Sequence, residues 1–154
     1  MAYTDGLFFV EGAATQGETA AAVVAVRGDT GQFIIIPGGA TIEEFGAVTI
    51  EAWDVAGANA CILDLKRITV YGGSGASLGT ITFPKTAGAA ASAVGVRSVN
   101  SVVKGTRVKP GEVLYFEVTQ AASDAGGAFI PYLILRLDGA KGANAAAPVV
   151  EYAA

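Results

Sequence analysis

The sequence predicts an all-β protein: a single, jelly-roll-like antiparallel β-sandwich. Short apolar runs recur along the 154 residues, and several of them alternate apolar and polar side chains with a period of two. Segments rich in Gly, Pro, Asp and Asn separate these runs at intervals of about 8–12 residues. No segment shows a convincing helical periodicity. The pattern predicts about eight strands, the number found in a jelly roll.

The chain divides into three regions. Residues 1–19 hold several turn-forming residues and one apolar cluster, Leu7-Phe8-Phe9-Val10, which predicts an extended N-terminal arm with a single anchor. Residues 20–138 carry the strands and form the sandwich, and residues 139–154 are a tail rich in Ala, Gly and Asn. One domain of this size can bury a sizeable core without a disulfide or a metal.

Turn residues predict how the first half of the sandwich is connected. Residues 22–26 and 32–36 are β-rich and flank the Gly- and Asp-rich segment 27–31, which predicts a β-hairpin. Residues 45–55 alternate and predict a half-buried strand. Residues 61–70 predict another strand, in which the apolar phase slips by one residue and indicates a β-bulge or a change of sheet.

The second half contains the clearest strands. Pro110 and Gly111 fit the two central positions of a type II turn. Residues 113–118 predict the clearest strand, with Leu114, Phe116 and Val118 on one face and Val113, Tyr115 and Glu117 on the other. Residues 128–137 are apolar on both faces, so both faces should be covered, and Pro131 favours an edge strand or a bulge.

The composition narrows the class of protein. Hydrophobic residues make up 52% of the chain and the mean hydropathy is +0.49. No apolar run approaches the roughly 20 residues of a membrane helix, so no membrane partner is expected. The N-terminus lacks the basic region and the long apolar run of a secretory signal. We therefore expect a protein made in a cytoplasm and kept there, or assembled there into something larger.

The side chains that most enzymes use are missing. The chain has no His and a single Cys, Cys61. Without His, the commonest general base, the Ser-His-Asp machinery and most transition-metal sites are excluded. A single Cys excludes an intrachain disulfide and a Cys-based zinc site. We expect a protein that is not an enzyme, with no catalytic residues, no cofactor and no metal.

Three motifs that could carry chemistry are better explained by turns and solvated surfaces. Residues 27–29, Arg-Gly-Asp, match an integrin-binding tripeptide, but Gly and Asp are also the residues that turns use. The Gly-rich segment 72–79 lies between strands and lacks the Lys of a P-loop. Glu43, Glu44 and Asp54 could form a cluster of carboxylates for acid-base or calcium chemistry, but they lack the spacing of a calcium-binding loop.

Charge is distributed unevenly along the chain. Residues 1–54 hold eight acidic side chains and one Arg, whereas residues 55–109 hold seven basic side chains and one acid. This asymmetry fits either a mosaic surface or electrostatic complementarity between copies in an assembly.

A basic stretch contains Arg97, Lys104, Arg107 and Lys109 with no acid among them. No aromatic residue lies within 94–112 and the calculated pI is about 4.7, so nucleic-acid binding is not expected. The pattern favours a charged strand edge, or a surface for an acidic protein.

A few single side chains remain to be assigned. Cys61 lies on the apolar face of an expected strand and is predicted to be a small buried hydrophobe. Trp53, Tyr71, Tyr115 and Tyr132 are the aromatic side chains that could stack on a sugar. Because they are spread along the chain, a core or interface role is favoured for them.

Several features occur together: an N-terminal segment ending near Val10, a Gly- and Ala-rich sandwich from about residue 20 to residue 138, the turn 108–112 leading into the strand 113–118, and a short tail. In this combination the chain resembles the small capsid decoration, or cement, proteins of tailed bacteriophages. The resemblance implies homotrimers at local symmetry axes of the shell that clamp neighbouring capsomers. It implies a structural virion protein on the capsid surface, with the major capsid protein as its partner.

The apolar cluster and the basic stretch are the segments expected to contact a partner: Leu7, Phe8, Phe9, Val10, Arg97, Lys104, Arg107 and Lys109. The N-terminal arm is expected to dock on that partner, so that loss of residues 1–12 leaves the fold intact. A homotrimer can pair the oppositely charged regions and hide the apolar faces of residues 128–137. The alternative function is a non-catalytic jelly-roll module that binds a carbohydrate or a receptor.

Overall fold

The computed structural model describes residues 3–4, 6–18, 22–26, 32–36, 38–54, 59–69, 73–85, 92–123 and 126–138. Their backbone forms two antiparallel sheets, which we call sheet I and sheet II, and contains no α-helix. The predicted all-β sandwich is therefore confirmed. No helix in this part of the chain is long and apolar enough to cross a membrane.

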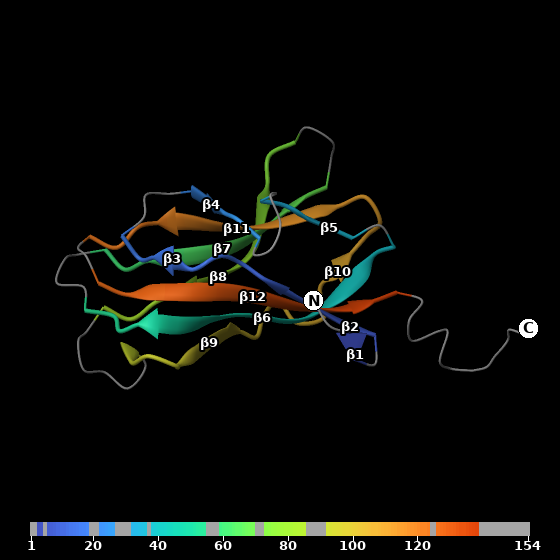
Figure 1. Cartoon of the computed structure of the whole chain (residues 1–154). Coiled ribbons are helices and arrows are strands. Elements are labelled where there is room, and N and C mark those ends of the chain that lie inside the picture. Colours follow the sequence, from blue (N-terminus) through green and yellow to red (C-terminus); the bar gives the residue numbers. More distant parts are fainter. Residues whose placement is uncertain are drawn as a thin grey trace, which may run out of the picture.

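Sheet I has seven strands: β1 (Tyr3–Thr4), β2 (Leu7–Glu11), β3 (Thr15–Gln16), β6 (Ala40–Glu51), β9 (Arg97–Asn100), β10 (Arg107–Val108) and β12 (Ala128–Leu137). Sheet II has five: β4 (Ala22–Val24), β5 (Ile34–Ile35), β7 (Ile62–Ile68), β8 (Ala76–Thr82) and β11 (Val113–Gln120). Figure 1 shows β11 and β7 lying above β12 and β6, with the strands running along the long axis of the molecule.

In each sheet, two short strands lie one after the other along the same edge of a longer strand. In sheet I, β2 and β3 follow one another along β12, and β9 and β10 follow one another along β6. In sheet II, β4 and β5 do the same along β11, which also pairs with β7, and β8 forms the far edge. The described strands thus occupy eight positions in the two sheets, three of them interrupted, and β1 extends one edge of sheet I.

The inner faces of the two sheets make the core. Cys61, Leu63 and Leu65 point inward as their alternation predicts, and all three are fully buried. Phe45 of β6 and Phe116 of β11 stack across the sandwich with ring centroids 6.2 Å apart. The period-two pattern of each strand is therefore sufficient to place its core side chains.

Trp53 closes one end of this core. Its ring stacks on Phe83 at 4.5 Å and on Phe129 at 6.2 Å, and its indole N–H donates to the Thr49 hydroxyl at 3.2 Å. The side chain is buried, and a Cβ on Gly127 would overlap its ring. Trp53 is therefore a core residue, and the sugar-stacking role considered for it is ruled out.

The structure corrects the prediction of an N-terminal arm over residues 1–19. Leu7–Glu11 form β2, which pairs with β12 from Glu11↔Tyr132 to Leu7↔Arg136. Val10 is 2% exposed and Phe8 packs against the core, because alternate residues of the apolar cluster face inward. The cluster is a strand of the sandwich and not a free anchor.

The predicted hairpin is also corrected. Val24 of β4 pairs with Phe116, and Ile34 of β5 pairs with Leu114, so both strands are antiparallel to β11. They run in the same direction along one edge of β11 and do not pair with each other. Each run satisfies its backbone hydrogen bonds on β11, which is long enough to take both. Residues 27–31, with the Arg-Gly-Asp tripeptide, lie outside the described residues.

Pro131 stands in a central strand and away from the register shifts of β12, contrary to the expected edge position or bulge. Its carbonyl accepts the Gly12 N–H at 2.8 Å, so the side of Pro131 that lacks an N–H faces the break between β2 and β3. At this break the chain turns to sheet II, where Gly12 bridges Val26 and the Ala13 N–H donates to the Ala25 carbonyl at 2.8 Å. The strand position beside Pro131 is therefore interrupted between β2 and β3, whereas β12, which contains Pro131, is continuous.

The predicted type II turn is confirmed, and the predicted bulge in residues 61–70 is not. The Lys109 carbonyl accepts the Glu112 N–H at 3.1 Å, and Gly111 has φ of 86°, as a type II turn requires. The phase slip in residues 61–70 is not a bulge of β7, because β7 pairs with β11 from Leu63 to Ile68 without a shift, and Ile68 lies on the outer face with Lys66. The register shift between β7 and β8 places its extra residue, Leu78, in β8.

Candidate functional site

Exposed apolar side chains gather at one border of sheet I. Ile50, Val94, Val99 and Val102 are exposed, and Val102 is the most open of them at 84%. They make up four of the seven large hydrophobic side chains that are exposed among the described residues. We call this surface, together with the basic Arg97 and Lys104 of the same segment, the β9 edge. An apolar cluster of this kind marks a binding surface in a soluble protein.

Pairing with β6 places the β9 edge. Val99 stands opposite Gly46 and Arg97 opposite Val48, so both side chains lie on the outer face of sheet I. The Gly95 N–H donates to the Thr49 carbonyl at 2.8 Å, which holds the turn that carries Val94 against the end of β6.

Asn100 and Val103 fix the turn that displays Val102. The Asn100 side-chain carbonyl accepts the Val102 N–H at 2.9 Å and the Val103 N–H at 3.2 Å. Its amide donates to the Thr80 carbonyl of β8 at 2.8 Å, and Val103 is buried. A Cβ on Gly79 would overlap Val103, so this glycine lets the two sheets approach here. Val102 is therefore held outward by an anchored turn.

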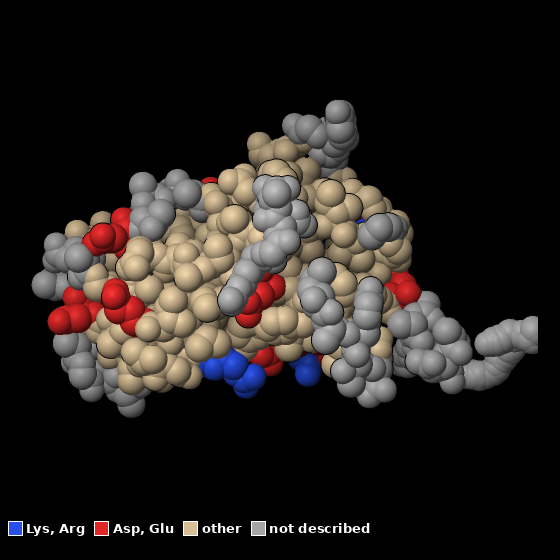
Figure 2. Space-filling view, in the orientation of Figure 1, with Lys and Arg blue, Asp and Glu red and all other residues tan. Residues whose placement is uncertain are grey.

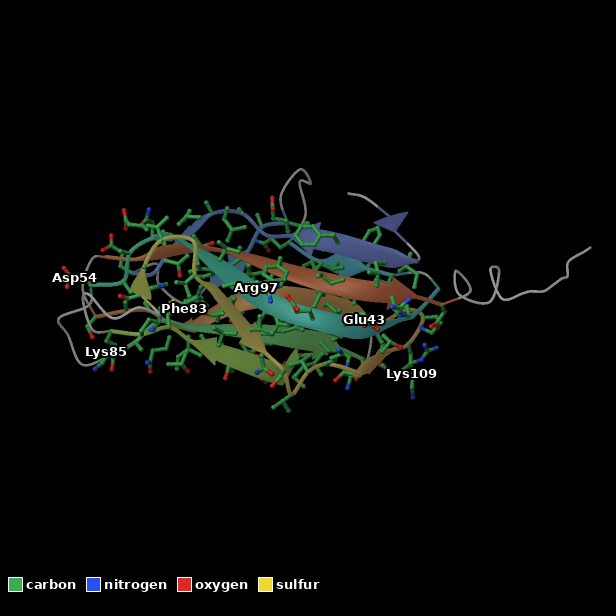
Figure 3. All side chains as sticks on the ribbon, turned by 90° about the horizontal axis from the view of Figure 1, so that it is seen from below. Glu43, Asp54, Phe83, Lys85, Arg97 and Lys109 are labelled. Carbon is green, nitrogen blue, oxygen red and sulfur yellow. The ribbon has the colours of Figure 1, made fainter. Side chains whose placement is uncertain are left out.

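The predicted basic residues follow the same border. Arg97 and Lys104 belong to the β9 edge, and Arg107 and Lys109 continue it along β10. Figure 3, seen from below, shows Arg97 over the middle of this face and Lys109 at one end. In Figure 2 most of the visible Lys and Arg surface lies at the lower margin, on the side of β6 and β9. The prediction of a charged strand edge agrees with this placement.

Two of these cations have acidic partners in the same chain. Arg97 contacts Glu44 at 3.2 Å, and the Arg107 guanidinium binds both carboxylate oxygens of Asp138. The hydrogen bonds from Arg107 lower the pKa of Asp138 below its usual value. Lys104 and Lys109 are both exposed.

Next to the β9 edge lies the rest of the outer surface of sheet I, which we call the outer apolar face. Phe9 stacks on Tyr132 with ring centroids 5.7 Å apart, and Ile134 pairs with Phe9 in the β2–β12 register. Tyr132 is buried under Phe9, and its hydroxyl donates to Glu44. Burial, followed by this hydrogen bond, raises the pKa of Tyr132 above its ordinary value. The complete set is Leu7, Phe9, Val48, Ile130, Tyr132 and Ile134.

The carboxylates considered for a joint site do not converge. A bulge between β6 and β12 turns both Glu43 and Glu44 outward, and Arg136 and Arg97 contact them at 3.2 Å each. Figure 3 shows Asp54 at the opposite end of the face from Glu43. The two glutamates are half-buried members of ion pairs, and in the described part of the chain no three His, Cys, Asp or Glu side chains could jointly hold a metal.

The structure divides the predicted interface residues. Leu7 and Phe9 are on the outer apolar face and the four basic residues are on its border, so one sheet brings the two groups together. Phe8 and Val10 belong to the core and are not available. Sequence reasoning did not select Val94 and Val102, because the turn of Val94 is held by β6 and the turn of Val102 by β8, and no local pattern shows these contacts.

Tyr115 and Tyr71 are the other aromatic side chains considered for sugar stacking. Tyr115 lies on the outer face of sheet II, away from the β9 edge, and Tyr71 is outside the described residues. Of the Gly-rich segment 72–79, residues from Ala76 onward belong to strand β8.

Comparisons with protein-family models, with curated proteins and with solved structures found no match to this chain.

Proposed function

We propose that this chain is a structural virion protein. It binds the outside of a phage capsid and stabilises the shell by bridging neighbouring capsid subunits. It is made in the host cytoplasm, and the major capsid protein is its partner. The resemblance described above supports this role. The strand order is consistent with this role, because the chain changes sheet between successive strand positions except from β7 to β8, an order that fits the expected jelly roll.

The β9 edge carries the proposal. Val102 projects from a turn that Asn100 fixes, and exposed basic side chains flank it. Apolar contacts with a surrounding basic border fit a protein surface that is apolar at its centre and acidic at its rim. The partner is therefore expected to present acidic side chains around a small apolar depression.

Co-sedimentation with capsid shells tests this function. Shells assembled from the major capsid protein of the phage that encodes this chain should pellet the wild-type protein. Val102→Glu and Val99→Glu should each abolish pelleting, because they put a charge into the apolar contact. Ile35→Glu is the matched control: Ile35 is 67% exposed on sheet II, so its variant should pellet like wild type.

Two results would count against the proposal. One is a wild-type protein that stays in the supernatant at all shell concentrations. The other is equal loss of binding in the Val102 and Ile35 variants while their thermal melts are unchanged. A double Lys104→Glu, Lys109→Glu variant should bind more weakly, and the wild-type affinity should fall with salt.

A further inference from the structure

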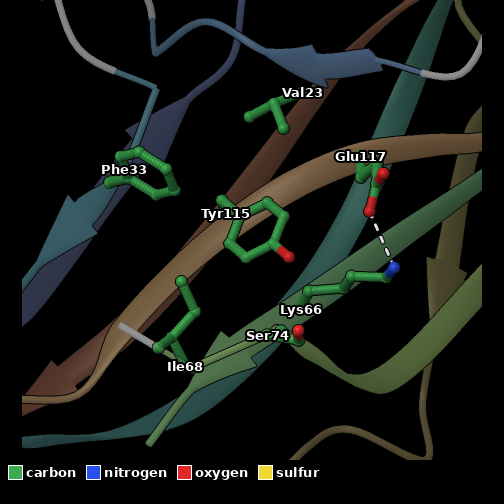
Figure 4. A pocket seen from close by; sticks show the side chains of 9 residues that line it. Val23, Phe33, Lys66, Ile68, Ser74, Tyr115 and Glu117 are labelled. Carbon is green, nitrogen blue, oxygen red and sulfur yellow. Dashed lines mark ion pairs between the residues drawn. The ribbon is translucent and has the colours of Figure 1, made fainter. Parts of the chain in front are cut away.

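A hollow lies on the outer face of sheet II, on the other side of the sandwich from the β9 edge. Its volume is about 320 Å³, within the range of about 300–1,000 Å³ typical of small-molecule sites. Strands β4, β7 and β11 form its floor, and residues 73–75 form one wall. Figure 4 shows the side chains that surround it.

One half of the hollow is apolar. Val23, Phe33 and Ile68 line it together with the ring of Tyr115. Phe33 meets Tyr115 edge to face, with ring centroids 5.5 Å apart and planes at 77°. Phe33 is 44% exposed while Tyr115 is 8% exposed, so Phe33 offers the open aromatic surface.

The other half is polar and fixed by the sheet. Lys66 Nζ lies 2.7 Å from Glu117 Oε1, and neighbouring strands β7 and β11 hold the two side chains. Figure 4 shows the Tyr115 hydroxyl pointing toward this pair, with Ser74 below it. A cationic hydrogen-bond donor and an anionic acceptor therefore lie side by side, and the net charge of the pair is zero.

Gly75 lets the wall close on the floor. A Cβ at this position would overlap the Tyr115 hydroxyl, so any other residue would push the loop away. The hollow thus depends on a close approach that only glycine permits.

We propose that this hollow binds a neutral sugar residue. A pyranose has an apolar C–H face, which fits Phe33 and Ile68, and an edge of neighbouring hydroxyls, which can donate to Glu117 and accept from Lys66. The balanced ion pair favours an uncharged ligand: Glu117 would repel an anion and Lys66 a cation. This inference does not rest on capsid binding, because the two sites are on opposite sheets.

Ligand-detected NMR tests it with the methyl glycosides of glucose, galactose, mannose and N-acetylglucosamine. At millimolar concentration, at least one glycoside should receive magnetisation from the saturated protein. The same glycoside should shift the resonances of backbone amides in β7, β11 and residues 73–75. Phe33→Ala and Glu117→Gln should each weaken that binding about tenfold or more. Thr119→Ala is the matched control, since Thr119 is exposed on β11 outside the hollow, and should bind like wild type.

The proposal is overturned if no glycoside binds at tens of millimolar, if the shifts map to another surface, or if an anionic sugar binds more tightly than every neutral one. Equal binding by wild type and Phe33→Ala also overturns it. That variant changes an exposed side chain, so it keeps the test decisive even if Glu117→Gln does not fold.

Discussion

Asp64 holds a carboxylate that is almost out of contact with water. The residue is 4% exposed, and the Ser77 hydroxyl donates to its Oδ1 at 2.6 Å. Burial raises the pKa of Asp64, and the Ser77 hydrogen bond and the Lys66 charge oppose that rise. The folded chain therefore holds this proton more tightly than the unfolded chain. The resulting stability is complete below the ordinary carboxyl pKa and is lost as the pH rises through the folded-state pKa.

Asp64→Asn should raise the unfolding temperature at neutral pH. The amide oxygen can still accept the Ser77 hydrogen bond, and the buried charge is gone. The gain over wild type should shrink to nothing as the pH falls below about 4, where Asp64 is protonated in both states. Thermal melts across this range measure it. A variant that is less stable than wild type by the same amount at every pH would exclude the buried charge as the cause.

Cys61 should be chemically silent in the folded protein. It is fully buried, and burial raises the pKa of its thiol to about 12, so the reactive thiolate is absent at neutral pH. A thiol reagent should label it only after unfolding, and Cys61→Ser should cost about 1–3 kcal/mol of stability. The melt should be the same with and without a chelator. Rapid labelling of the native protein would contradict the first expectation, and a chelator-induced drop of many degrees would contradict the last.

At the scale of elements, β2 is the strand whose role the structure changes most. Val10→Ala removes two buried methyl groups and should lower the free energy of unfolding by about 2–3 kcal/mol. Deleting residues 1–12 removes the whole β2 pairing with β12 and should leave an unfolded or molten chain. Circular dichroism and urea titration measure both. A truncated chain that melts like wild type would restore the idea of a dispensable arm.

Sequence patterns predict single strands here better than they predict strand partners. Residues 113–118 predict the clearest strand, and β11 directs Leu114, Phe116 and Val118 into the core as expected. The hairpin prediction fails because partner choice is decided by β11, which is distant in the sequence and offers a long edge to both β4 and β5. The arm prediction fails for the same reason: β12, the partner of Leu7–Glu11, lies more than a hundred residues later. Alternation is local, whereas pairing is a property of the folded chain.

At the scale of the whole molecule, folding mixes the charges that the sequence keeps apart. Glu43 and Glu44 of the acidic first third contact Arg136 and Arg97, and further pairs join Lys66 to Glu117 and Arg107 to Asp138. The basic border of the candidate site is predictable, because its residues are close in sequence. Its apolar part is not, because the exposure of Val102 depends on Asn100 reaching β8.

The ion pairs within one chain indicate which surface should join the copies of the predicted homotrimer. Charges already paired within one chain have less to gain between chains, so the contact between copies should come from apolar burial on the outer apolar face. Phe9 is exposed at its centre. Light scattering at micromolar concentration should give the mass of three chains, and the trimer should persist in about 1 M salt, where exposed charges interact over only about 3 Å.

Phe9→Glu should convert the trimer to a monomer without unfolding it, because Phe9 stacks on the surface of Tyr132 and not in the core. Val102→Glu serves as the control and should remain trimeric, since the β9 edge is assigned to the capsid. A wild-type monomer would contradict the trimer outright. A trimer that dissolves in salt but tolerates Phe9→Glu would place the contact on charged residues instead. The outer apolar face would then be free to join the β9 edge in binding the shell, and a standard interface of about 1,200–2,000 Å² would require both surfaces.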